Sequence, residues 1–498
     1  MKWLFLLMIL LAAPGIGAWL KTGPRGAPWI WGLLGFLPFV IGPWHLFVAP
    51  YSTPGWPGYA KGWEVSLLDA VAVGILLGAR GRWPRVPLLI PLLAYILAVT
   101  IAMYQAQFGK LAFSYVFQLL RVLVVFLAVA RVAVSERAEK AVLTGLVAGL
   151  AVQAAYAIVD RAGGALQTGG SLGHQNLLGF VSHLVLMPAF AMFLAGRWPR
   201  VATVGLLSGV ICVILTASRA TIAFSGIGFA LTLLISIAVR FTGRKLMLGG
   251  VAVLLVAASF PVAQSALDRR FQVQRSTFFT EDKEREAFAV AARAMISANP
   301  MGVGPNHYVV VANTQGYSAR AGVSWATGSR STNVHNSYLL VAAETGYFGL
   351  VTLLALLGSA IWLALSTAIR FRRQSGCEVL IGVGCGILAM SIHGLFEWMF
   401  VVAPTQYVLA ALLGIITAIR SRYIRAAKRE PVKHRARIGR VLMGGRNGAE
   451  RGRPIPSLGS DTATTLSSKA SSAGLPFDPA GASVTDRPSF CGDGSVRD

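Results

Sequence analysis

The chain has 498 residues and a net charge of +25, and 55% of its residues are hydrophobic whereas only 13% are charged. Ordinary globular proteins have roughly 25% charged residues, so this composition excludes a soluble protein. The apolar residues form uninterrupted blocks such as 201–217 and 246–263, close to the ~20 residues with which a helix spans a bilayer. The sequence therefore predicts an all-α polytopic membrane protein.

Thirteen hydrophobic segments follow one another along the chain, which predicts twelve or thirteen transmembrane helices. They lie near residues 3–20, 28–49, 64–79, 86–106, 111–130, 141–159, 175–196, 201–217, 220–239, 246–264, 337–369, 379–399 and 403–419. The first segment imitates a signal peptide, but its apolar run continues through Trp19 and Leu20 without a clean cleavage site. We therefore expect it to be retained as a helix, whereas cleavage would leave twelve spans.

Positive charge alternates between the connections. One set of connections is basic and contains Lys21, Arg25, Arg80, Arg82, Arg85, Arg131, Arg137, Lys140, Arg197, Arg200, Arg240, Arg244, Lys245, Arg370, Arg372 and Arg373. The intervening short connections contain only Lys61, Lys110 and Arg161. Because Lys and Arg resist translocation, the basic set should face the cytoplasm. The long connection at 265–336 then faces outward, and the C-terminus lies inside.

The segment at 420–453 supplies +10 of the net charge of +25. Residues 420–453 carry twelve Lys or Arg and two Glu, which is a juxtamembrane anchor for anionic lipids rather than a nucleic-acid site. We expect a transmembrane bundle over 1–420 with the outward loop at 265–336, a basic cytoplasmic segment at 421–453, and a disordered polar tail at 454–498. The four cysteines show no pairing pattern, which argues against disulfides and thiolate metal sites.

Polar residues at membrane depth are either paired or functional. For Arg121 we favour a structural ion pair with Asp69 or another buried acid. His45 and His183 could each be satisfied by a neighbouring carbonyl, and neither is a catalytic candidate.

Four polar motifs fall at the outer face in this topology: Ser171-Leu-Gly-His-Gln-Asn176, Ser218-Arg219-Ala220, Glu284-Arg285-Glu286 and His335-Asn336. Together they supply two arginines for phosphate groups and a histidine that can act as a base, as a lipid-linked phosphate substrate requires. Singly, an arginine at a helix end is more often a headgroup anchor, and an interfacial histidine is more often merely solvated.

The outward loop contains an amphipathic helix expected at 287–298, followed by the turn Asn299-Pro-Met-Gly-Val-Gly304. The turn lacks the Gly-Lys-Ser/Thr of a nucleotide P-loop. His307, Tyr308, Tyr317 and Trp325 could stack on sugars, but packing of the loop is the preferred interpretation. No motif with metal-ligand spacing appears, so we predict chemistry that needs neither metal nor cofactor.

The run from His335-Asn336 through Glu344 to Gly346-x-x-Gly349 resembles the signature of the O-antigen ligase and O-antigen polymerase family. Arg285, the Asn299–Gly304 turn and Ser218-Arg-Ala are also similar to that family, and the resemblance covers about residues 170–400. It implies an integral-membrane glycosyltransferase of GT-C architecture in the bacterial inner membrane. Such an enzyme moves a glycan from undecaprenyl diphosphate to an acceptor hydroxyl on the periplasmic side, in lipopolysaccharide or surface polysaccharide assembly.

By this resemblance His335 is the general base, and Arg219 and Arg285 hold the diphosphate. Negative charge develops on the departing diphosphate, and the guanidinium groups neutralise it. A site with one base and no evident nucleophilic side chain predicts direct displacement, which inverts the anomeric carbon. The 265–336 loop would carry part of this active site. Supporting roles are assigned to His174, Asn176, Asn336, Glu344, His393 and Glu397.

Some of these supporting residues also have structural alternatives. Glu344 could be a carboxylate in the first turn of a helix or the partner of a buried cation. His393 and Glu397, four residues apart in the twelfth span, could orient Arg219 or simply form a structural pair.

The acceptor is a lipid A core sugar for a ligase, or another carrier-linked glycan for a polymerase, and the sequence does not separate the two. A transporter of small anions is a weaker alternative, since the polar residues crowd the outer face instead of the membrane midplane.

Overall fold

The computed structural model describes residues 2–80, 83–273 and 275–446, and helices dominate it. The chain divides into two units, residues 1–433 and 434–498, and the described part of the second unit, 434–446, is helical. The predicted tail at 454–498, the end of the basic segment and Cys491 lie outside the described residues.

The long helices account for every predicted hydrophobic segment. They are α1 (Lys2–Lys21), α2 (Ala27–Phe36), α3 (Leu67–Gly78), α4 (Leu89–Ala102), α5 (Gly109–Val132), α6 (Glu136–Ala162), α7 (Gln175–Ala195), α8 (Pro199–Leu215), α9 (Arg219–Val239), α10 (Gly243–Val273), α15 (Ser337–Arg370), α16 (Cys377–His393) and α17 (Ala403–Arg446). Within the described residues, seven helices are long and apolar enough to cross a membrane: α1, α5, α6, α7, α9, α15 and α17 up to Lys428. The all-α polytopic fold is therefore confirmed, while the count of twelve or thirteen spans stays a prediction.

The second predicted segment is shorter than the hydropathy suggested. Helix α2 ends at Phe36 in a short 3-10 turn, Leu37–Phe39, because Pro38 cannot continue the hydrogen-bond ladder. Strands β1 (Phe47–Val48) and β2 (Val65–Ser66) follow and pair antiparallel. The loop between these strands belongs to the end of the bundle that carries the functional motifs.

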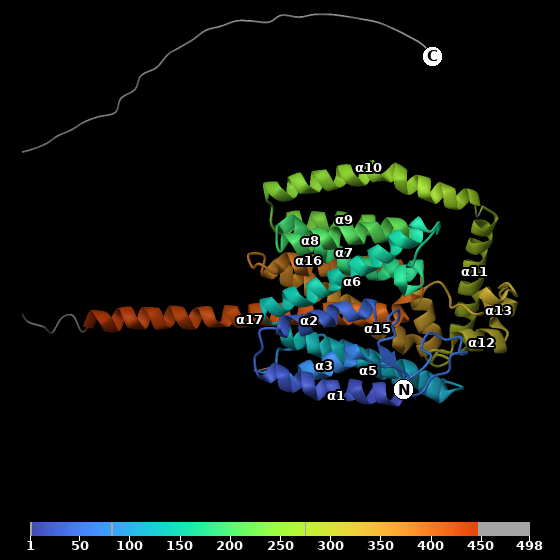
Figure 1. Ribbon diagram of the computed structural model, residues 1–498, viewed down its shortest axis with the longest axis horizontal. Helices are drawn as coiled ribbons and strands as arrows, with labels where there is room; N and C mark the ends of the chain where they lie inside the picture. Colours follow the sequence, from blue (N-terminus) through green and yellow to red (C-terminus); the bar gives the residue numbers. More distant parts are fainter. Residues whose placement is uncertain (1, 81–82, 274, 447–498) are drawn as a thin grey trace, which may run out of the picture. The chain divides into compact units, whose positions relative to one another are not determined.

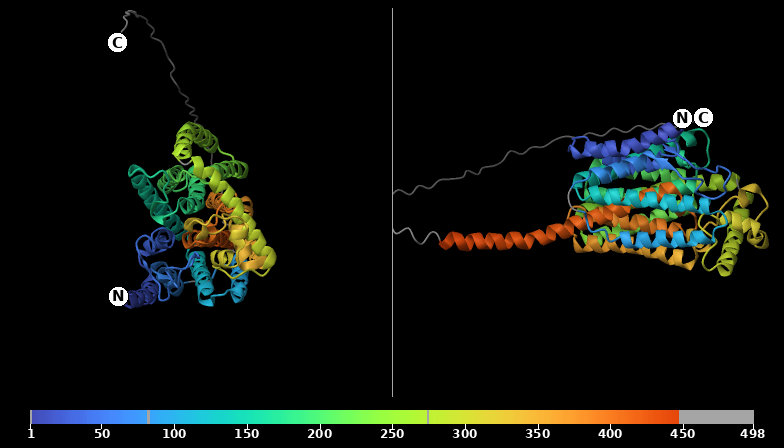
Figure 2. Two further views of the ribbon diagram at one scale, coloured as in Figure 1. Left: turned by 90° about the vertical axis from the view of Figure 1, so that its right-hand side faces the viewer. Right: turned by 90° about the horizontal axis from the view of Figure 1, so that it is seen from below.

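Helix α7 lies at the centre of the bundle and packs against α8, α9 and α16. Its membrane-spanning window is 94% buried, so it touches protein on all sides rather than lipid. Helices α2 and α6 also approach closely, because a Cβ atom added to Gly145 would collide with the backbone oxygen of Gly32. These contacts hold the helices side by side in Figures 1 and 2.

The ion pair expected for Arg121 is confirmed. Its Nε lies 3.0 Å from both carboxylate oxygens of Asp69, and its second guanidinium nitrogen donates to Ser66 Oγ at 2.9 Å. Asp69 and Ser66 also form the capping box that begins α3. This cluster is structural, and it explains a charged residue in the middle of α5.

The connection between α10 and α15 is itself mostly helical. It contains α11 (Arg275–Ala298), α12 (Tyr308–Thr314), α13 (Tyr317–Arg320) and α14 (Thr327–Arg330). Helix α11 starts at Arg275, twelve residues before the amphipathic helix expected at 287–298. Figure 1 shows α11, α12 and α13 gathered at one end of the bundle.

A hydrogen-bonded clasp joins this connection to α15. The carboxylate of Glu344 accepts from the backbone N–H groups of Asn306 and Tyr308, both at 2.9 Å, and from the Tyr59 hydroxyl at 2.5 Å. Two residues later Gly346 has φ 68° and ψ −174°, which kinks α15 against the turn at Pro300 and Met301. The glycine therefore approaches this turn rather than a neighbouring span.

Candidate active site

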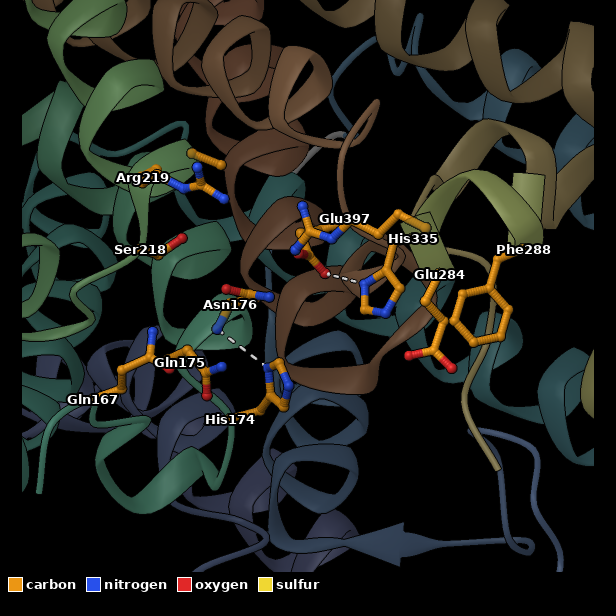
Figure 3. Close-up of a pocket in the computed structure, with 12 residues that line it drawn as sticks. Gln167, His174, Gln175, Asn176, Ser218, Arg219, Glu284, Phe288, His335 and Glu397 are labelled. Carbon is orange, nitrogen blue, oxygen red and sulfur yellow. Dashed lines mark hydrogen bonds and ion pairs between the residues drawn. The ribbon is translucent and has the colours of Figure 1, made fainter. Parts of the chain in front are cut away.

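A polar pocket of about 190 Å³ opens at the end of the bundle that carries α11. Arg219, Arg285 and His335 all line it, although they are up to 116 residues apart in sequence (335 − 219). Figure 3 shows Arg219 and His335 among the lining residues. The full lining consists of Gln167, His174, Gln175, Asn176, Ser218, Arg219, Ala220, Glu284, Arg285, Phe288, His335 and Glu397. The structure thus brings together the three residues that the sequence selected, and all four outer motifs contribute to the lining, with nine of its twelve residues.

Helix N-termini surround this pocket. Helix α7 begins at Gln175 with His174 as its N-cap, and α9 begins at Arg219 with Ser218 as its N-cap. A third helix, α15, begins two residues after His335. Because the first N–H groups of a helix are unpaired and the macrodipole is positive there, these ends favour a bound anion.

Glu397 connects the predicted base to one of the predicted phosphate ligands. Its Oε2 lies 3.1 Å from His335 Nδ1, and its Oε1 accepts from Arg285 at 3.2 Å. Its side chain is only 2% exposed, compared with 22% for His335 and 38% for Arg285. A buried carboxylate therefore holds two partners whose other nitrogen atoms remain accessible from the pocket.

His174 and Asn176 occupy the wall formed by the start of α7. The His174 Nδ1 accepts the backbone N–H of Asn176 at 3.2 Å, so this ring nitrogen carries no proton. Burial lowers the pKa of His174 below its usual 6.5, with Glu397 raising it and His335 lowering it to smaller extents. The supporting position predicted for both residues agrees with this geometry.

Asn336 does not line the pocket, but it fixes the chain beside His335. Its side-chain oxygen accepts from the N–H groups of Tyr338 and Leu339 at 2.9 and 3.0 Å, and its amide donates to Leu395 O. It is the N-cap of α15 and also joins α15 to the turn that carries Glu397. Its role is therefore to position two pocket residues.

Two supporting assignments need correction. Glu344 lies outside the pocket, in the clasp described above, and its partners there are a phenol and backbone N–H groups rather than a cation. His393 is buried and hydrogen-bonds His183 at 3.0 Å, and His183 also contacts Ser225 at 3.2 Å instead of a carbonyl.

The expectation that His393 and Glu397 lie on one helix is also wrong. Helix α16 ends at His393, so Glu397 belongs to the following turn and binds Arg285 and His335. Ser337 Oγ donates to the backbone oxygen of Glu397 at 2.6 Å and so joins the start of α15 to this turn. Hydropathy does not reveal a long-range contact of this kind.

Sequence reasoning gave no role to several lining residues, and the most informative of them is Glu284, which it named only as part of an outer motif. One of its carboxylate oxygens, Oε1, is buried and has no hydrogen-bond partner among the described residues. Phe288 lies one turn later on α11, with its ring centroid 5.9 Å from that of His335. The i, i+4 spacing of these two residues was the available signal. Gln167, Gln175 and Ser218 complete the polar side opposite.

The aromatic residues of the loop are mostly packing residues, as preferred from the sequence. His307 and Tyr308 are buried and Tyr317 is 9% exposed, whereas Trp325 is 80% exposed and lies under Arg330. Burial also lowers the pKa of His307, whose Nε2 accepts from the backbone N–H of Phe108.

No curated protein matches the chain. A family model described as O-antigen ligase matches residues 202–354. The matched stretch contains Arg219, Arg285 and His335, whereas His174, Asn176 and Glu397 lie on either side of it. The match supports a glycosyltransferase-type enzyme that uses carrier-linked glycans. Residues 202–354 are thus identified as an O-antigen ligase domain within a multi-pass membrane protein, which supports a role in polysaccharide assembly.

Proposed function

We propose that this chain transfers a glycan from an undecaprenyl-diphosphate carrier to an acceptor hydroxyl on the periplasmic side of the bacterial inner membrane. The transfer is an inverting displacement that needs no metal. The observation that carries this proposal is the convergence of His335, Arg219 and Arg285 on one pocket beneath the starts of α7 and α9. A base and two cations in one cavity suit a hydroxyl attack that releases a diphosphate.

The base in this proposal is His335. Because Nδ1 faces Glu397 at 3.1 Å, the tautomer with hydrogen on Nδ1 leaves the lone pair of Nε2 for the acceptor hydroxyl. The bond from the acceptor oxygen to the anomeric carbon forms as the bond from that carbon to the diphosphate oxygen breaks. The electron pair leaves with the diphosphate, and the acceptor proton passes to Nε2 and then to water.

The leaving group is held by Arg285 and Arg219. A guanidinium group offers paired N–H donors that match phosphate oxygens, and it stays charged at any physiological pH. The N–H groups at the starts of α7 and α9 add to this positive region. A pocket of about 190 Å³ suits the diphosphate and the reacting sugar ring, so the lipid and the rest of the glycan extend beyond it.

The acceptor side is assigned to Glu284 and Phe288. The buried, unpartnered oxygen of Glu284 can accept a hydrogen bond from a sugar hydroxyl, and the Phe288 ring offers an apolar face to the pyranose. The acceptor is a lipid A core sugar in a ligase and another carrier-linked glycan in a polymerase. Surface glycans of a deletion strain separate the two: unattached long chains indicate a ligase, and single repeat units indicate a polymerase.

The decisive test uses purified full-length protein with a defined undecaprenyl-diphosphate glycan and candidate acceptors. His335→Ala and Arg285→Gln should lower turnover by about 100-fold or more, as expected when a general base or a leaving-group ligand is removed. Arg293→Gln is the matched control, because Arg293 is an exposed arginine on the same helix that pairs with Glu286. Turnover should also persist in EDTA. Near-normal turnover by folded His335→Ala would contradict the proposal.

A further inference from the structure

A second cavity, of about 620 Å³, lies among α1, α2, α3, α5 and α6. Four arginines line it, namely Arg80, Arg131, Arg137 and Arg425. We call it the arginine cavity. Its other walls are apolar or small, and include Leu20, Trp31 and Ile75. It shares no lining residue with the polar pocket.

The arginine cavity is a concentration of positive charge. No Asp or Glu is present among the described residues that line it. Backbone carbonyl groups orient the arginines: Arg131 donates to Ala79 O at 3.1 Å, Arg425 to Trp83 O at 2.9 Å, and Arg137 to Arg25 O at 3.2 Å. A guanidinium has five N–H donors, so a bond of this kind leaves further donors of Arg137 for an anion. The cavity therefore favours a group with several negative oxygens.

The two cavities lie at opposite ends of the bundle. Helix α5 has 24 residues, and Arg131 is in its last turn. Phe108, just before its first residue, donates its backbone N–H to His307 in the connection that carries α11. At 1.5 Å per residue the helix is about 36 Å long, which slightly exceeds the ~30 Å hydrocarbon core of a bilayer. The arginine cavity thus lies at the headgroup depth of the leaflet opposite the polar pocket.

The surroundings fit a lipid better than a soluble anion. Trp83 is 52% exposed, and the Arg131 guanidinium lies over its ring at 5.1 Å, as expected for an aromatic residue at a membrane interface. Leu20, Trp31 and Ile75 also line the cavity and provide an apolar wall along which acyl chains can lie. Basic pockets between transmembrane helices recognise the phosphate of anionic headgroups in this way.

We propose that the arginine cavity binds the phosphate headgroup of an anionic phospholipid, with its acyl chains against the apolar wall. This lipid is distinct from the carrier substrate and occupies the other leaflet. It fills the space between α1, α2 and α5 and neutralises part of the charge that the arginines bring together.

The test measures lipid retained by the purified full-length protein. Native mass spectrometry after incubation with phosphatidylglycerol should detect bound lipid, whereas phosphatidylcholine should be retained far less. Arg131→Gln/Arg137→Gln should lower phosphatidylglycerol retention by about tenfold. The control Arg200→Gln/Arg370→Gln removes two arginines from the same end that do not line the cavity, and it should retain the lipid.

A second variant distinguishes loss of the lipid site from misfolding. Ala79→Leu narrows the cavity while all four arginines remain, and it should also reduce lipid retention. Equal loss in the control variant would overturn the proposal, because retention would then reflect general surface charge. Unchanged retention in both cavity variants would overturn it as well. If inorganic phosphate at millimolar concentration displaced the lipid completely, the site would bind free phosphate instead.

Discussion

Glu397 is the side chain on which the geometry of the polar pocket depends most, because His335 and Arg285 both bind it. Glu397→Gln should keep the fold but weaken both contacts. We expect turnover to fall by about 10- to 100-fold, as is typical when the residue that orients a functional histidine is changed. Steady-state kinetics with donor and acceptor varied separately will check this. Glu286→Gln, an exposed glutamate on α11, is the control and should be neutral. Similar turnover in both variants would remove Glu397 from the site.

The burial and the capping role of His174 lead us to expect a specific effect of pH on the stability of the fold. Its pKa is lowered by burial, and its neutral Nδ1 caps α7 by accepting from Asn176 N–H. Its contribution to stability is therefore complete above the unfolded value of 6.5 and is lost as the pH falls through the lower folded pKa. His174→Asn keeps a capping side chain without this titration. Melting temperatures of both proteins between pH 7.5 and 5 should diverge on acidification, with the wild type losing more. Parallel curves would contradict this role.

At the residue scale, the sequence identified the charged residues that line the pocket, but it did not identify the contacts that hold them in place. His335, Arg219 and Arg285 were selected because each is a charged or titratable residue at a predicted outer boundary, and all three line one cavity. Glu344 was misassigned because its partners are the distant Tyr59 hydroxyl and two backbone N–H groups, those of Asn306 and Tyr308. Backbone donors leave no signal in a sequence.

Helix α15 owes its kink to one glycine, and this predicts the cost of an added methyl group. Gly346 has φ 68° and ψ −174°, a conformation essentially restricted to glycine. A Cβ atom there would also lie 2.6 Å from Met301 C. Gly346→Ala should destabilise the fold by about 3 kcal/mol and lower the melting temperature. Gly358→Ala in the same helix, where a Cβ would meet no atom within 4 Å, should be neutral or slightly stabilising. Equal effects of the two changes would contradict the strain argument.

At the element scale, hydropathy located the membrane helices well because each contains a long apolar run. It overestimated the segment at 28–49, since β1 and the preceding turn contain apolar residues without helical structure. The short helices α12, α13 and α14 were not predicted at all. Helices of 7, 4 and 4 residues are stabilised by tertiary packing rather than by their own periodicity.

The positive-inside pattern predicts the orientation of the whole molecule in the membrane. In a Cys491→Ser background, Trp325→Cys should react with an impermeant maleimide added outside spheroplasts, because Trp325 is 80% exposed in the α11–α15 connection. Arg372→Cys, in the connection between α15 and α16, should react only after permeabilisation. The cysteines at 212, 377 and 385 are buried and should stay silent. The reverse labelling pattern would invert the proposed topology.

At the scale of the whole molecule, the fold class followed from composition, whereas the pairing of helices did not. The central position of α7 and the close contact of α2 with α6 depend on small residues and on contacts between segments that are far apart in the sequence. The arginine cavity likewise combines arginines from positions 80 to 425, which charge counting assigned to one membrane side without bringing them together.

The shared carboxylate of Glu397 also has a consequence for the order of events in catalysis. An arriving diphosphate would compete for Arg285 and draw it away from Glu397. Glu397 would then keep His335 as its partner, so its carboxylate would orient the imidazole alone only after the donor is seated. This exchange of partners favours a sequential scheme in which the donor binds before the acceptor.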